Sequence, residues 1–220
     1  MKLSLPPDRL AAYVADQLSS SFPDYTLGVA GISPALALTI ERVEYCFSRI
    51  RDKYFVDGKD VVFNHLHSDQ YAMFLYLLSH TVWSVEENEE VAARIYGLNK
   101  HLHAIDVFYQ VELPDIFLFN HCIGTVLGRA QYANYLMVHH NCTIGANYDG
   151  EYPIIEEGVV MHAGSVIAGR CHIRTNSWLE AGAIVIDSEL PAGQVIFGQY
   201  PDMRCKQARR NVRDIYFTAG

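Results

Sequence analysis

Residues 155–185 read IEEGVVMHAGSVIAGRCHIRTNSWLEAGAIV, and this stretch decides the fold because it repeats every six residues. One position of the repeat always holds a large apolar residue: Ile155, Met161, Ile167, Ile173, Leu179 and Val185. The position four residues further on holds a small or β-branched one: Val159, Ser165, Cys171, Ser177 and Ala183. A helix repeats every 3.6 residues and a strand every two, so neither explains a period of six. Short strands and turns that wind into a triangular coil do explain it, and the sequence predicts a parallel β-helix.

The same period continues upstream of this stretch. Tyr132, Val138 and Ile144 occupy the large position, and Leu136 and Cys142 occupy the small one. Ile144 and Ile155 are eleven residues apart, which is one residue short of two repeats. The segment between them, ANYDGEYP, is rich in turn-forming residues and predicts a loop that leaves the coil near residues 145–154. The alternative, a sandwich of ordinary short strands, would not repeat at both positions.

The N-terminal half of the chain predicts helices instead. Apolar residues recur there at helical spacing in four segments: 8–18, 35–50, 70–83 and 89–105. The predicted helix starts are Ser33–Pro34, Ser68–Asp69 and Asn88. The third segment is apolar almost all round, which predicts a central helix. Residues 55–63, with their aspartates and glycine, predict a loop.

These patterns divide the chain into three regions and predict an α+β fold. We expect an α-helical N-terminal domain over residues 1–105 and a β-helix domain over residues 106–200 with its loop near 145–154. A C-terminal tail is expected over residues 201–220. With 220 residues, half of them apolar, the chain is long enough for a substantial core.

Composition argues against several classes of partner. The net charge of −8 is unfavourable for a nucleic-acid surface, which needs clustered Lys and Arg. The five cysteines form no CxxC pair and no zinc spacing, so we expect reduced thiols in a cytoplasmic protein rather than disulfides. The first ten residues have no apolar signal-peptide region, and no apolar run is long enough to span a membrane. We therefore expect no nucleic-acid and no membrane partner.

Four motifs resemble the serine acetyltransferases, a branch of the hexapeptide-repeat acyltransferase superfamily. They are NHCIGTVLG at 120–128, HNCTIG at 140–145, EGVVMHAG at 157–164 and FGQYP at 197–201. The resemblance covers roughly residues 60–206. It implies a left-handed β-helix, acetyl-CoA as the acyl donor, a small-molecule acceptor, and assembly as a homotrimer or a dimer of trimers.

The resemblance also implies a catalytic pair, His121 with Asp106 fifteen residues before it. An alcohol is a poor nucleophile at neutral pH and needs a base to take its proton as it attacks a thioester. A carboxylate on the other ring nitrogen would fix the imidazole tautomer and stabilise the imidazolium. An outward-facing histidine on a coil turn, with no catalytic role, is the simpler reading of His121 alone.

The acceptor side departs from the family pattern. The family has aspartate before the catalytic histidine and an Arg-His pair on the protruding loop, whereas this chain has Asn120 and Glu151–Tyr152. Without that arginine, serine is expected to be a poor acceptor. The alternatives are another amino acid, a sugar or a nucleotide sugar, with O- or N-acetylation of the last two. The residues expected at the acceptor site are Asn120, His140, Tyr152 and Asp60.

The resemblance places coenzyme A in a groove between neighbouring subunits. Small residues that let pantetheine approach the backbone are expected to line it: Gly145, Ala163, Gly164, Ala181 and Gly182. Arg204 and Lys206 belong to a basic cluster that is expected to bind the adenosine phosphates. The alternative for this cluster is a solvated C-terminal helix over residues 206–217 with scattered charges.

Other histidines leave further functions open. His140 is the second candidate for the catalytic base. His139 and His140 are adjacent, so they point to different sides, and no Asp or Cys stands at a ligand spacing from them, so no metal is expected. A carbonic anhydrase-like metal site would need one of them together with His162 across a trimer interface. A non-catalytic β-helix assembly protein is the remaining alternative.

Overall fold

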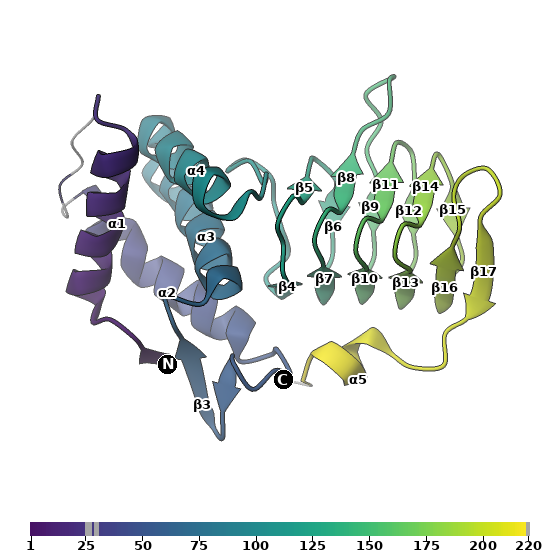
Figure 1. Cartoon of the computed structure of the whole chain (residues 1–220), viewed down its shortest axis with the longest axis horizontal. Helices are drawn as coiled ribbons and strands as arrows, with labels where there is room; N and C mark the ends of the chain where they lie inside the picture. The colour runs from purple at the N-terminus through teal and green to yellow at the C-terminus, as the bar shows by residue number, and fades with distance from the viewer. Residues whose placement is uncertain (25–27, 29–30, 219–220) are drawn as a thin grey trace.

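The structure, a computed structural model, describes residues 1–24, 28 and 31–218, and consists of a helical bundle followed by a coil of short strands (Figure 1). The helices of the bundle are α1 (Pro7–Ser21), α2 (Ser33–Phe47), α3 (Ser68–Glu86) and α4 (Glu89–His103). α3 packs against both α2 and α4 and is buried along most of its length, as its all-round apolar sequence predicted. Within the described ranges no helix is long and apolar enough to cross a membrane.

The helix starts follow the predictions in part. The Asn88 side chain caps α4 by accepting a hydrogen bond from the Val91 N–H at 3.1 Å, as predicted. At α3 the cap is His67, whose Nδ1 faces the Gln70 N–H at 3.5 Å. Asp69, which was predicted to help cap α3, instead turns its carboxylate toward the coil.

Residues 55–63, predicted as a loop, contain a β-hairpin. β2 (Val56–Asp57) pairs antiparallel with β3 (Asp60–Phe63), and β1 (Lys2–Leu3) pairs parallel with β3 on its other side. The turn signals that suggested a loop belong to the hairpin turn, where Gly58 has a φ of 65° that favours glycine.

The six-residue repeat folds as predicted into a coil of three parallel sheets, here called faces A, B and C. Face A contains β4 (Phe117–Phe119), β7 (Leu136–Val138), β10 (Val159–Met161), β13 (Ser177–Leu179), β16 (Gln194–Phe197) and the antiparallel β17 (Arg204–Gln207). Face B contains β5 (Val126–Leu127), β8 (Thr143–Gly145), β11 (Val166–Ala168) and β14 (Ile184–Ile186). Face C contains β6 (Gln131–Tyr132), β9 (Ile154–Ile155), β12 (His172–Ile173) and β15 (Glu189–Leu190).

Both positions of the repeat point into the coil. The large residues from Ile155 to Val185 are at most 1% exposed, and the small ones from Val159 to Ala183 are at most 2% exposed. The large side chains belong to the strands, whereas each small one begins a strand or directly precedes it, where the chain changes direction. The period of six is therefore the spacing between equivalent inward positions on successive faces.

The loop and the tail complete the fold. Residues 146–153 form a loop that projects from the coil between β8 and β9 (Figure 1), as the phase shift predicted. Residues 204–207 form a strand, so the alternative of one helix over 206–217 is wrong; only α5 (Val212–Tyr216) is helical. After α5 the chain returns to the helical bundle, where the fully buried Phe217 forms a bridge with Ile50.

Candidate active site

His121 lies in the turn that leads from β4 to β5, and the bundle fixes this turn. The buried Asp69 carboxylate, near the start of α3, accepts hydrogen bonds from the backbone N–H groups of His121 at 3.0 Å and Cys122 at 3.4 Å. His121 has a φ of 53°, an uncommon value for a residue with a side chain. Such strained residues persist where their surroundings hold them, and they cluster at functional sites.

The imidazole of His121 is presented to the outside. Its side chain is 80% exposed, and its Nδ1 lies 4.0 Å from Asp69 Oδ2. This distance is too long for a hydrogen bond but short enough for a carboxylate to attract a protonated ring. His121 is thus an accessible imidazole with a carboxylate nearby.

Asp106 does not occupy that position in the structure. Its carboxylate accepts hydrogen bonds from the Tyr96 hydroxyl at 2.6 Å and the Lys100 ammonium at 2.5 Å, both on α4. Burial works against ionisation, but these two hydrogen bonds outweigh it and lower the pKa of Asp106. Within the described ranges no hydrogen bond or ion pair joins Asp106 to His121. The carboxylate next to His121 is that of Asp69.

A cavity of about 170 Å³ adjoins His121. It lies where the loop after α2, the start of α3, the end of β4 and the C-terminal helix meet. Of the residues predicted for the acceptor site, Asn120 lines it. Arg51, Asp52, His67 and Asp69 also line it, and they were missed as site residues because no local motif marks them.

Tyr152 and Asp60 lie elsewhere. Tyr152 shares a second cavity, of about 350 Å³, with Asp106 and Arg129, and the Arg129 guanidinium lies 5.6 Å from the centre of its ring. Asp60 belongs to the hairpin at the edge of the bundle, where it forms an ion pair with Lys2 at 2.7 Å. In a single chain, therefore, neither residue lies in the cavity beside His121.

The turns between faces A and B stack into one edge of the coil, the A–B edge. The Gly164 N–H donates to the His140 carbonyl at 3.0 Å, and the Gly182 N–H donates to the Ala163 carbonyl at 2.9 Å. His121, His140 and the pairs Ala163–Gly164 and Ala181–Gly182 therefore follow one another along this edge. Gly145 differs, because it lies on face B at the end of β8.

His139 and His140 point to different sides, as expected. His140 is exposed, whereas the His139 ring packs 5.1 Å from that of His162. Burial, aided by the neighbouring His162, lowers the pKa of His139 to about 4. Its buried Nε2 has no hydrogen-bond partner in the described part of the chain. Among the described residues, no three His, Cys, Asp or Glu side chains form a group that could hold a metal ion.

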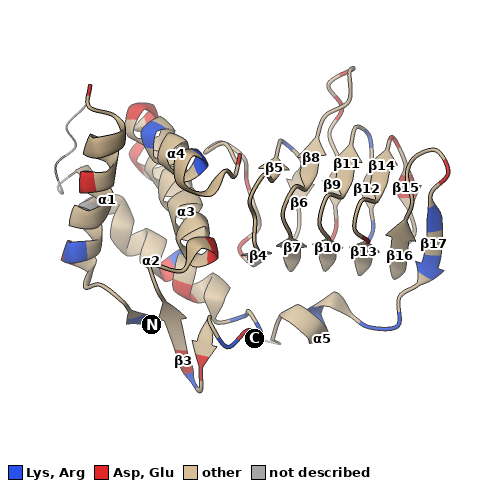
Figure 2. Cartoon of the chain, viewed as in Figure 1, with Lys and Arg blue, Asp and Glu red and all other residues tan. Residues whose placement is uncertain are grey.

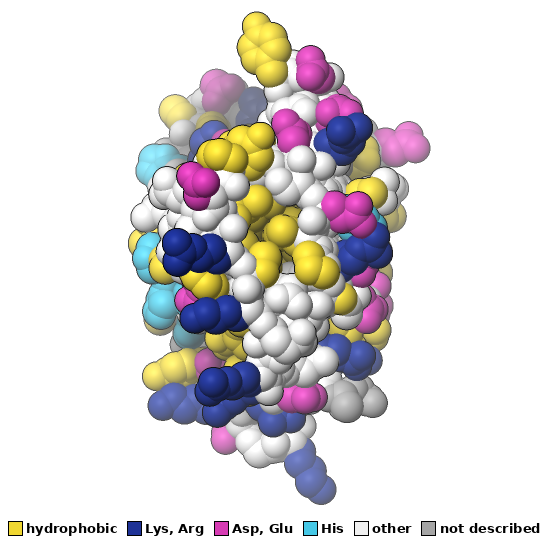
Figure 3. Space-filling view, turned by 90° about the vertical axis from the view of Figure 1, so that its right-hand side faces the viewer, with side chains coloured by type: hydrophobic (Ala, Val, Ile, Leu, Met, Phe, Trp, Pro, Cys, Tyr) yellow, Lys and Arg dark blue, Asp and Glu magenta, His cyan; other side chains and the backbone are white. Residues whose placement is uncertain are grey.

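Arg204 and Lys206 lie on β17, at the end of the coil remote from the bundle (Figure 2). Both are exposed, and the Lys206 ammonium lies 5.1 Å from the centre of the Phe197 ring. Arg204 lines an open cavity of about 550 Å³ together with Phe197 and Gly198, which follow one another at the end of β16. Figure 3 looks onto this end and shows Lys and Arg side chains along its flanks.

Comparison with known proteins identifies the class of fold. The chain superimposes on serine acetyltransferase from Vibrio cholerae with a TM-score of 0.72, at 14% identity, over 93% of this chain and 80% of that one. A serine acetyltransferase from Brucella abortus, solved in complex with coenzyme A, gives a TM-score of 0.70 at 16% identity, over 94% and 84% of the two chains. The fold is accordingly a helical domain followed by a left-handed parallel β-helix, as predicted.

Sequence comparison agrees with the structural one. No family model matches the chain. A putative serine acetyltransferase from Schizosaccharomyces pombe is 24% identical over 125 residues, which is 55% of this chain and 46% of that protein. The chain thus spans about half the length of this relative. The resemblance to serine acetyltransferases that the motifs predicted is confirmed in sequence and in fold.

Proposed function

We propose that this chain is a CoA-dependent O-acetyltransferase that acts on the hydroxyl group of a small acceptor. The observation that carries the proposal is the position of His121: an exposed imidazole at the A–B edge, next to the buried carboxylate of Asp69 and to a cavity of about 170 Å³. The likeness to serine acetyltransferases, one of them solved with coenzyme A, supports acetyl-CoA as the donor.

In the proposed reaction, His121 removes the proton of the acceptor hydroxyl while the oxygen attacks the thioester carbonyl. The C–S bond then breaks, the acetyl group stays on the acceptor, and the CoA thiolate takes the proton back from the imidazolium. Asp69 stabilises that imidazolium and holds the turn from which the ring projects. Asp69 therefore takes, in this proposal, the positioning role that the resemblance implied for Asp106.

Acetyl-CoA is proposed to lie along the A–B edge. The small residues at 163–164 and 181–182 follow His121 along this edge, and their backbone leaves room for a pantetheine chain. Arg204 and Lys206 stand on β17 at the far end, five strand spacings of about 4.8 Å from β4, the strand that leads to His121. They are the residues proposed to bind the phosphates.

A homotrimer is the proposed assembly because the outer surface of face B is apolar. Outward-facing Val126, Val166 and Ile184 are at least partly exposed there in the single chain. Three copies arranged around a threefold axis bring the two unlike edges of face B together, because contacts in a closed ring are head-to-tail. The A–B edge with His121 would then face the neighbour's opposite edge, which carries the cavity of Asp106 and Tyr152.

The cavity beside His121 bears on the acceptor. The expectation that serine is a poor acceptor rested on the missing loop arginine, since Glu151 stands in its place. Arg51 lines the cavity and supplies a cation for a carboxylate, and Asp52 supplies an anion for an ammonium group. We therefore propose a small hydroxy amino acid as the acceptor, with serine among the candidates.

The decisive experiment measures thiol release from acetyl-CoA with a panel of acceptors: L-serine, L-homoserine, and amino- and hydroxy-sugars. His121→Ala should lower kcat by roughly 10²–10⁴-fold, the usual contribution of a general base. Binding of acetyl-CoA should survive, since the base does not hold the donor, and His140→Ala is the matched control on the same edge. Near-normal turnover in His121→Ala, with loss in His140→Ala, would transfer the role to His140.

A panel with no turnover for the unmodified protein would favour the non-catalytic assembly protein. If a sugar gave the highest kcat/KM of the panel, the proposed acceptor would be wrong, but the proposal of acetyl transfer would stand. Arg51→Gln should raise KM for the amino acid and leave KM for acetyl-CoA unchanged, which separates the acceptor assignment from the donor assignment.

A further inference from the structure

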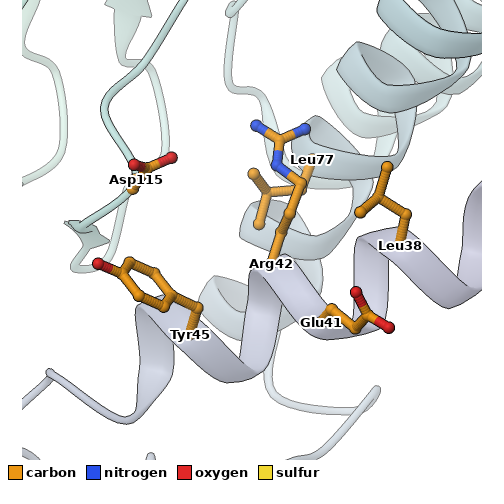
Figure 4. A pocket seen from close by; sticks show the side chains of 6 residues that line it. All are labelled: Leu38, Glu41, Arg42, Tyr45, Leu77 and Asp115. Atoms are coloured by element: carbon orange, nitrogen blue, oxygen red, sulfur yellow. The ribbon is translucent and has the colours of Figure 1, made fainter.

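The helical bundle contains a cavity that the proposed reaction does not use. It has a volume of about 350 Å³ and lies between α2, α3 and the segment that leads into β4 (Figure 4). Its lining residues are Leu38, Glu41, Arg42, Tyr45, Leu77 and Asp115. None of them lines the cavity beside His121.

Arg42 supplies this cavity with a cation. Its Nη1 donates a hydrogen bond to the Thr81 hydroxyl at 2.8 Å, which fixes the half-buried guanidinium against α3. Among the residues that the structure describes, no carboxylate lies within ion-pair distance of Arg42. Only one N–H group of Arg42 is bonded to Thr81, so its other N–H groups remain available to an anion. A guanidinium suits a carboxylate because it can donate two parallel hydrogen bonds to the two oxygens.

The other walls of the cavity are apolar or acidic. Leu77 is buried and forms the floor, and Leu38 is partly exposed beside it. The Tyr45 ring is held in place because the Arg49 guanidinium stacks 3.6 Å from its centre. Asp115 lies across the cavity from Arg42, with its carboxylate turned toward the opening between them (Figure 4).

We propose that this cavity binds a small α-amino acid with an aliphatic side chain, at a site separate from that of acetyl transfer. Arg42 binds the carboxylate, Asp115 binds the ammonium group, and the side chain lies against Leu38, Leu77 and Tyr45. Such a ligand would connect the bundle to the segment before β4, because Arg42 and Asp115 stand on opposite sides of that junction.

The test is isothermal titration of the full-length protein with L-leucine, with 4-methylpentanoate, which lacks the ammonium group, and with 3-methylbutylamine, which lacks the carboxylate. L-Leucine should bind once per chain and more tightly than either analogue. Arg42→Gln should weaken leucine binding roughly ten- to a hundredfold, the loss expected for a hydrogen bond to a charged group, and Arg42→Lys should restore part of it. Arg9→Gln, which removes the same charge from an exposed position on α1 that does not line this cavity, is the matched control.

Asp115→Asn should weaken leucine binding but leave the affinity for 4-methylpentanoate unchanged. The proposal is overturned if leucine does not bind up to its solubility limit, or if Arg42→Gln binds it as tightly as the unmodified protein. It is also overturned if Arg51→Gln, at the cavity beside His121, abolishes binding while Arg42→Gln does not. Circular dichroism of each variant checks that the bundle remains folded.

Discussion

Faces B and C come from the same six-residue repeat, yet their outer surfaces differ. On face B the outward residues are Val126, Thr143, Val166 and Ile184. On face C, by contrast, they include His172, whose Nε2 lies 2.7 Å from Glu156, and Arg174 bonds Glu189. The inward positions are equally apolar on both faces. The repeat thus specifies the coil through its interior, while the outward positions decide whether a face meets protein or water.

Face A shows a third arrangement, because the chain covers it with its own tail. The Tyr216 ring lies 5.8 Å from that of Trp178, and the Val212 N–H donates to the Asn176 side chain at 2.9 Å. Phe217 packs edge-on against Tyr135 with the ring centres 5.4 Å apart. The tail of the chain therefore covers the outer surface of face A. Among the described residues, no segment covers the apolar outer surface of face B in this way.

The largest effect is expected from a charge on face B. Val166→Glu should abolish the trimer, because a carboxylate would be buried without a partner at the centre of the proposed interface. The matched control is Ile154→Glu, which adds the same charge to an outward position on face C. Light scattering measures the mass in solution. If Val166→Glu still has the mass of a trimer, or if the unmodified protein has the mass of a monomer, face B is not the interface.

A smaller but substantial effect is expected where the tail covers face A. Phe217→Ala should lower the free energy of unfolding by about 3–5 kcal/mol, since Phe217 is fully buried and its removal leaves a cavity. Thr218→Ala, one residue further on, removes only a long hydrogen bond of 3.3 Å to Ser48 and is the control. Urea unfolding measures both. Equal stability of the two variants would mean that the tail contributes little to the fold.

The next effect concerns the half-buried His139 at the edge of face A. The folded protein keeps this ring neutral down to a pH of about 4, whereas the unfolded chain takes up the proton near pH 6.5. Between these values the unfolded state binds more protons, so stability is lost as the pH falls from about 6.5 to about 4. The loss should reach about 1–3 kcal/mol.

His139→Gln should remove this part of the pH dependence, while His140→Gln, at the exposed neighbour, should keep it. Melting temperatures of the three proteins across this pH range provide the measurement. Two other half-buried histidines, His80 and His103, also have pKa values lowered by burial, and they contribute equally to the pH dependence of all three proteins. If the melting temperature depends on pH in His139→Gln as it does in the unmodified protein, His139 is not the source of this pH dependence.

The smallest effect is expected on face C. Arg174→Ala breaks exposed ion pairs with Glu189 and Glu156, and such pairs are screened by water and salt. Its melting temperature and its mass in solution should match those of the unmodified protein. A clear loss of either would mean that face C is covered by a partner, which would remove the contrast with face B.

The coil could be predicted from sequence because its signal is local and repeated. The inward residues from Ile155 to Val185 are all buried in the same way, so each repeat supports the prediction made from the others. The surroundings of His121 could not be predicted in the same way. Asp69 is 52 residues away from His121 along the chain, and only the packing of α3 against the start of the coil brings the two together.

Charge pairing was the other feature that the sequence left open. The resemblance implied Asp106 as the partner of His121, whereas in the single chain Lys100 and Tyr96 on α4 bind that carboxylate. Arg51 was overlooked for a similar reason, since the loop after α2 reaches the cavity only through the fold. Local sequence motifs therefore pointed to His121, whose role as the base stays a proposal, but not to the groups that surround it in the fold.

The return of the tail to the bundle also affects how the coil comes apart. A solenoid whose last repeat is free loses its repeats one by one from that end, because each repeat contacts only its neighbours. Here β17 pairs with β16, and beyond it Phe217 bridges Ile50 while the Thr218 N–H donates to the Arg49 carbonyl at 2.8 Å. The polypeptide thus forms a closed circuit from the bundle, through the coil and back. Fraying from the C-terminal end must first break that closure, which ties the stability of the last repeat to that of the helices.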